Sequence, residues 1–109
     1  MTPRRRDPAL NTQPRRRACL EVRRTEPTCH LCGHGFPHVD QQRHRLAFTV
    51  DELIPRSKGG SATERGNLRA AHRLCNSLRN DRPLTPNVYD ECRAAITALI
   101  TVATPSRNW

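Results

Sequence analysis

The apolar positions of this chain gather in short runs between long polar stretches. Residues 46–50 alternate along a run of β-forming side chains, which predicts a strand. A second short strand is expected at residues 52–54, where Pro55 ends it. Residues 87–103 repeat apolar side chains every three to four positions, the spacing of one helix face. The pattern therefore predicts helices and strands mixed within one small unit.

Two further helices are expected, at residues 18–25 and 71–80. The earlier one ends before Pro27, because the residue preceding a proline disfavours the helical conformation. The first 17 residues contain two Arg-Arg-Arg runs and three prolines, which is typical of a disordered basic arm. We therefore divide the chain into this basic arm (1–17), a folded domain (18–103) and a C-terminal tail (104–109).

Composition limits the core that this domain can build. The 109 residues include nine prolines and only four aromatic side chains. A domain this small often needs a metal ion or disulfides to remain folded. Five cysteines are an odd number, and no apolar signal segment follows the basic N-terminus. We therefore expect a cytoplasmic protein with reduced thiols and a bound metal rather than a disulfide framework.

Two short clips supply ligands for such a metal. Cys29 and Cys32 form C-x-x-C, and His72 and Cys75 form H-x-x-C far along the chain. Three thiolates and one imidazole are a ligand set of structural zinc sites. The alternative is that these are buried small residues at unrelated positions. The remaining thiols, Cys19 and Cys92, are expected to pack in the core.

The charge of the chain indicates a polyanionic partner. Its formal net charge is +9, and 18 of its 19 basic residues are arginine, whose guanidinium group binds phosphate with two parallel hydrogen bonds. DNA is the expected partner, and a membrane is not, because no long apolar span is present. A GC-rich genome or a need for solubility would also produce an arginine excess. We expect a monomer or a weak dimer.

Three motifs follow the first clip in order. They are D-x-x-x-P-x-S-x-G-G from Asp51 to Gly60, Asn67-Leu68, and H-x-x-C-N from His72 to Asn76. Together with C-x-x-C, this series resembles the HNH endonuclease family, in particular the small zinc-stapled proteins of actinobacteria and their phages. The resemblance implies a small α+β fold with a ββα-metal core, flanking helices and hydrolysis of DNA phosphodiester bonds.

The resemblance also implies roles for individual residues. Asp51 and Asn76 would hold a catalytic divalent ion, Mg²⁺ or Mn²⁺, with Ni²⁺ as a further candidate. Asn67 would steady the loop that aims the general base, and Cys29, Cys32, His72 and Cys75 would hold structural zinc. Basic side chains near the motifs are expected to contact DNA phosphates: Arg56, Lys58, Arg73 and Arg79. Each of these residues also has an ordinary structural interpretation as a turn, cap, core or solvated residue.

One position departs from the family pattern. The residue after the aspartate is normally a histidine that deprotonates the attacking water, and here it is Glu52. Glutamate can act as a general base, but its ordinary pKa of about 4.3 makes it weaker than imidazole. His38 or His44, in the polar segment before the strand, are alternative bases. The rival hypotheses are a non-catalytic zinc-stapled DNA-binding module and, less favoured, an RNA-binding zinc ribbon.

Overall fold

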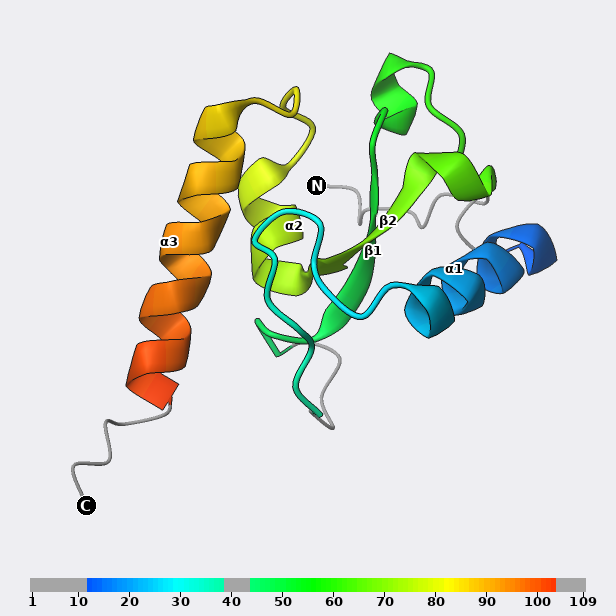
Figure 1. Cartoon of the computed structure of the whole chain (residues 1–109). Coiled ribbons are helices and arrows are strands. Elements are labelled where there is room, and N and C mark those ends of the chain that lie inside the picture. The colour runs from blue at the N-terminus through cyan, green and yellow to red at the C-terminus, as the bar shows by residue number, and fades with distance from the viewer. Residues whose placement is uncertain (1–11, 39–43, 104–109) are drawn as a thin grey trace, which may run out of the picture.

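The computed structural model describes residues 12–38 and 44–103 (Figure 1). Three helices surround a two-stranded antiparallel sheet, which confirms the expected small α+β fold. The elements are α1 (Gln13–Thr25), β1 (Phe48–Glu52), two single-turn 3-10 helices η2 (Arg56–Lys58) and η3 (Arg65–Asn67), β2 (Leu68–His72), α2 (Arg73–Arg79) and α3 (Pro86–Ala103). No helix in the described ranges is both long and apolar enough to cross a membrane.

The sheet is a hairpin whose second strand is not where the sequence predicted it. β1 lies two residues later than expected, and the strand expected at residues 52–54 is wrong, because β1 pairs instead with β2. Phe48 lies opposite His72, and Glu52 lies opposite Leu68. β2 has the sequence Leu-Arg-Ala-Ala-His, with no β-branched residue, and is almost entirely buried. Tertiary packing of small side chains, rather than strand propensity, therefore determines β2.

Helix α1 begins earlier than predicted, at Gln13. The hydroxyl of Thr12 accepts a hydrogen bond from the backbone N–H of Arg15 at 3.2 Å, and Pro14 occupies the first turn, where it loses no helical hydrogen bond. Residues 13–17 therefore belong to the folded domain and not to the basic arm. The rest of the predicted arm, residues 1–11, and the predicted tail lie outside the described residues.

Two clusters of buried side chains form the core. Ala18 and Val22 of α1 pack against Leu68 and Ala70 of β2. The larger cluster joins α2, α3 and the first clip, and it contains Cys29, Leu31, Cys32, Leu46, Ala71, Cys75, Val88, Cys92 and Ile96. Helix α3 lies alongside α2 (Figure 1), so the helical pattern predicted at 87–103 is confirmed, and Cys92 is a core residue as expected. The clip cysteines are thus built into the centre of the domain.

Glu26, directly after α1, connects this helix to β2. Its carboxylate accepts hydrogen bonds from the backbone N–H of Ala70 (2.9 Å) and from the side chains of Arg69 (3.0 Å) and Arg65 (2.7 Å). Burial alone would raise the pKa of Glu26, but these hydrogen bonds outweigh it and hold the pKa below its ordinary value. The ionised form of Glu26 therefore stabilises the fold.

We predict that Glu26→Gln lowers the free energy of unfolding above the ordinary glutamate pKa of about 4.3. A depressed pKa in the folded state contributes stability that is lost as pH falls through that pKa, so the parent and the variant should converge in acid. Urea unfolding at several pH values measures this difference. Glu21→Gln, which changes an exposed pair with Arg65, is the control and should have a small effect throughout.

Candidate functional site

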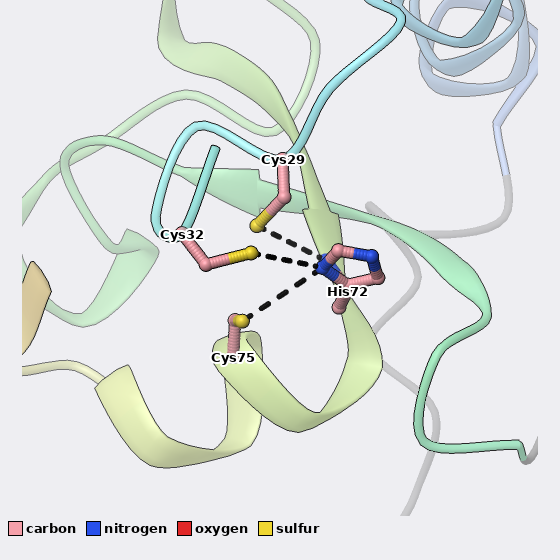
Figure 2. Close-up of side chains that lie close together, drawn as sticks. All are labelled: Cys29, Cys32, His72 and Cys75. Carbon is pink, nitrogen blue, oxygen red and sulfur yellow. Dashed lines mark hydrogen bonds between the residues drawn. The ribbon is translucent and has the colours of Figure 1, made fainter. Parts of the chain in front are cut away.

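Four buried ligand atoms converge where the first clip meets the junction of β2 and α2 (Figure 2). The ligand atoms of Cys29, Cys32, His72 and Cys75 all lie within 4.8 Å of one another. His72 Nδ1 is 3.2 Å from Cys32 Sγ and 3.9 Å from Cys75 Sγ. Zn–S bonds of about 2.3 Å and Zn–N bonds of about 2.0 Å place tetrahedral ligands at similar separations. These residues fit one zinc ion.

The surroundings prepare these ligands for a metal. His72 Nε2 lies 2.8 Å from the Gly35 carbonyl oxygen, so it donates there and leaves Nδ1 free to face the cysteines. The backbone N–H groups of Leu31 and His72 both lie 3.4 Å from Cys29 Sγ. Without a metal, hydrogen bonds from Cys32 and Cys75 lower the pKa of Cys29. Burial opposes protonation of His72, yet hydrogen bonds to the thiolates raise its pKa to about 10.

A second group of polar residues lines a hollow of about 290 Å³ at the end of β1. Asp51 and Glu52 reach it from the end of β1, and Asn76 reaches it from α2. The side-chain amide of Asn76 makes no hydrogen bond to another described residue, so it is available to a ligand. The hollow therefore gathers the three residues for which the sequence predicted metal binding and proton transfer.

Asp51 is held rigidly within this site. Its side chain is 3% exposed, and its two oxygens accept hydrogen bonds from different partners. Arg79 Nη1 donates to Oδ1 at 2.8 Å, and His30 Nε2 lies 2.7 Å from Oδ2. Each carboxylate oxygen can accept a second interaction, so Asp51 retains lone pairs for a cation in the hollow.

The prediction that Arg79 contacts DNA phosphates is wrong. Its side chain is only 1% exposed, and besides Asp51 it donates to the backbone carbonyls of Glu52, Leu53 and Arg82. A buried guanidinium whose three nitrogens all donate within the protein is not exposed to a phosphate. The helix expected at residues 71–80 placed Arg79 in a helix, but gave no sign that its side chain faces inward. Its function is to fasten α2 to the end of β1.

Glu52 is also engaged by arginines. Its carboxylate lies 3.2 Å from Arg15 Nη1 and 3.3 Å from Arg56 Nε. Arg15 belongs to α1 and also donates to the Ala62 carbonyl at 3.0 Å, so it ties the helix to both β1 and the loop beyond it. We call Arg15 and Arg56 the arginine pair. This pair contacts the residue that stands at the general-base position.

Asn67 closes the loop between the strands. Its Oδ1 accepts a hydrogen bond from the Ile54 N–H at 2.8 Å, and its Nδ2 donates to the carbonyls of Ile54 and Ser61. Gly60 packs so tightly here that a Cβ atom would lie 1.6 Å from the Ile54 oxygen, which explains the second glycine of the motif. Asn67 is thus placed to position the loop, with its amide group fully used by the backbone.

The other predicted residues lie farther from the hollow. His44 Nδ1 accepts a hydrogen bond from the Leu46 N–H, and His38 lines a larger neighbouring hollow of about 600 Å³. Neither lines the hollow that contains Asp51, so the structure does not support either as the alternative base. Lys58 is exposed and donates to the Asp81 carbonyl, whereas Arg73 is exposed and lines the larger hollow.

The two hollows form one basic surface along β1. They share Arg15, Thr49 and Val50, and the larger one adds Arg23 and Arg73. Arg23 also lies over the Phe48 ring, 5.3 Å from its centre. Arginine side chains therefore line the surface that leads along β1 to Asp51.

Sequence reasoning missed two residues of this site. His30 lies between the zinc ligands Cys29 and Cys32 in the sequence and was read only as a spacer residue. Arg15 was assigned to the basic arm. The C-x-x-C spacing gave no signal for His30. The Thr-x-Pro sequence at residues 12–14 is a helix-start signal that could have placed Arg15 on a helix.

Comparison with models of protein families matches residues 29–82 to the HNH endonuclease model. The matched segment begins at the first zinc clip and contains both metal candidates, Asp51 and Asn76. No curated protein matches the chain.

We predict that the purified protein carries about one zinc ion per chain and loses its helical circular dichroism when chelators remove it. The reason is that the four ligands join the two halves of a small core. Cys19→Ser, which changes a half-buried thiol outside the tetrad, should retain the zinc. A Cys29→Ala/Cys75→Ala variant that folds without zinc would contradict this prediction.

We also predict that Arg79→Ala destabilises the zinc-loaded protein by about 3–5 kcal/mol, because it leaves a buried carboxylate without its cationic partner. Arg79→Lys should recover only part of the lost free energy of unfolding, since an ammonium group cannot reproduce the planar set of contacts. Urea unfolding measures both effects. Arg93→Ala, which removes an exposed pair with Asp90, should change stability by less than about 1 kcal/mol.

Proposed function

Because residues 29–82 belong to the HNH endonuclease family, we propose that this protein is a metal-dependent nuclease that hydrolyses phosphodiester bonds in DNA. One observation supports this above all others: Asp51 and Asn76 line the same hollow, although they come from different elements. An acidic oxygen and an amide oxygen are suitable ligands for a hard divalent ion. The zinc tetrad is separate from this hollow and has a structural role.

The oxygen donors fit the implied catalytic ion. Asp51 offers its remaining lone pairs, and Asn76 offers an amide that no described residue occupies. When bound, Mg²⁺ or Mn²⁺ would stabilise negative charge on the scissile phosphate and the departing 3′ oxygen. Arg79 and His30 would keep the Asp51 carboxylate in place behind that site.

Glu52 is the proposed general base. It lies directly beside Asp51 in the chain and lines the same hollow, so a water molecule there is within its reach. In the free protein its carboxylate is held by the arginine pair. A DNA phosphate entering the hollow would compete for the same guanidinium groups and release Glu52 toward the water. Arg15 therefore joins Arg56 among the residues proposed to contact phosphate, whereas Arg79 leaves that group.

DNA would reach this site along the larger hollow. Its arginines, together with the net charge of +9, favour binding to the phosphate backbone, with affinity that falls steeply as salt increases. Contacts of this kind position DNA without reading its sequence. We therefore propose nicking or cleavage with weak sequence preference, with Arg56, Lys58 and Arg73 among the phosphate contacts.

A second function is favoured by the same arginine pair. The carboxylate oxygens of Glu52 accept hydrogen bonds from two guanidinium groups, so they are already occupied and not free to take a proton from water. If DNA does not release Glu52, the protein would act as a zinc-stapled DNA-binding module without catalysis. The two functions differ in chemistry but share the same surface.

Nicking of supercoiled plasmid with Mg²⁺, Mn²⁺ or Ni²⁺ distinguishes them. We predict that the parent nicks DNA, and that Asp51→Ala and Asn76→Ala abolish nicking while zinc content is unchanged. Glu52→Ala should lose about 10²–10⁴-fold in rate, the usual contribution of a general base, while retaining DNA affinity. Glu52→His should keep or increase activity near neutral pH.

The outcomes separate the functions. A parent that never nicks, under metals that activate Glu52→His, would overturn the nuclease and leave the binding module. Glu52→Ala that nicks as fast as the parent would show that another group takes the proton. Arg93→Ala, far along α3, is the control for a general loss of positive charge.

A further inference from the structure

His30 makes a contact that the proposed function does not yet explain. Its imidazole is 4% exposed, and its Nε2 lies 2.7 Å from Oδ2 of Asp51, which is itself 3% exposed. His30 does not line the hollow that contains Asp51. It therefore contacts the carboxylate without lining the hollow itself.

The chemistry of the pair assigns the proton between the two atoms. Two polar atoms 2.7 Å apart need a hydrogen between them. Arg79 donates to the other oxygen of Asp51, and a carboxylate offers only acceptors, so the hydrogen between Asp51 and His30 belongs to the imidazole. His30 consequently donates from Nε2. Arg79 and His30 each donate to one oxygen of Asp51. The two hydrogen bonds together fix the rotation of the carboxylate about its Cβ–Cγ bond.

The backbone of His30 is fixed as firmly as its ring. Its N–H donates to the carbonyl oxygen of Ala70 at 2.9 Å, and Ala70 pairs across the sheet with Val50, the residue before Asp51. On either side, Cys29 and Cys32 belong to the zinc tetrad. The turn that carries His30 is thus clamped both by the sheet and by the zinc ligands.

We propose that His30 is a positioning residue that orients Asp51 toward the catalytic ion and thereby couples the zinc clip to the catalytic site. This inference rests on the proposed function, in which Asp51 is a ligand of that ion. A partner behind a ligating carboxylate typically changes metal affinity or activity by about 10–100-fold. The structural zinc would then have a second role. Its ligands Cys29 and Cys32 hold the turn that carries His30, and His30 orients Asp51.

The decisive variants are His30→Ala and His30→Gln in the full-length, zinc-loaded protein. Glutamine places an amide N–H close to the position of the imidazole Nε2 and can still donate to Asp51, whereas alanine cannot. Binding of Mn²⁺ is measured directly, by electron paramagnetic resonance of the free ion, together with zinc content and thermal unfolding. Plasmid nicking as a function of Mn²⁺ concentration is followed in parallel.

We expect His30→Ala to weaken Mn²⁺ binding about 10–100-fold while each chain still carries one zinc ion. His30→Gln should recover most of the affinity, and the concentration of Mn²⁺ needed for half-maximal nicking should follow the same order. A purely structural role would lower the melting temperature of His30→Ala without changing its Mn²⁺ affinity below the melting range.

Other outcomes overturn the proposal. Parent and His30→Ala proteins that bind Mn²⁺ equally, while Asp51→Ala does not bind, would reject the role of His30 and leave the proposed metal site intact. If His30→Gln binds as weakly as His30→Ala, a positioning donor is rejected. If neither the parent nor Asp51→Ala binds Mn²⁺, both this inference and the proposed metal site are rejected.

Discussion

The tetrad of Cys29, Cys32, His72 and Cys75 is the constraint on which the rest of the fold depends. Two of its members lie in the loop after α1, one ends β2 and one lies in the first turn of α2. Metal ligation therefore joins segments about 40 residues apart in the chain at a single point. The buried side chains around that point are mostly small, so apolar packing alone offers little. A bound metal would therefore fix the first turn of α2, which carries Cys75 and, next to it, Asn76.

A second connection fixes the end of β1 relative to α2. Arg79 is buried, and burying a charge is costly unless it is paired and hydrogen-bonded. Here the guanidinium meets the Asp51 carboxylate and several backbone carbonyls, so its cost is offset within the protein. A set of diverging acceptors suits the planar guanidinium and not a lysine ammonium. The same contact fixes the Asp51 carboxylate at the end of β1, where it lines the hollow.

The sequence predicted the ligands better than the architecture that presents them. The zinc clips and the helix at 87–103 were predictable, because ligand spacing and helical periodicity are local signals. β2 was not predictable, since Leu68–His72 becomes a strand only through burial against α1 and the pairing with β1. The inward direction of Arg79 and the contact of His30 with Asp51 depend on how distant segments meet. No pattern within either segment carries that information.

The chain keeps its two proposed metals apart by donor chemistry and by solvent access. The tetrad offers sulfur and nitrogen donors in a buried cluster, which suits zinc. The hollow at Asp51 offers oxygen donors beside open solvent, which suits a harder ion that retains several waters. Arg15, Arg56 and Arg79 around that hollow outnumber Asp51 and Glu52, so its charge favours an incoming phosphate. An entering phosphate would add the negative charge that a divalent ion needs, and would draw the arginine pair away from Glu52. In the proposed function, substrate, ion and base are linked through these same charged residues.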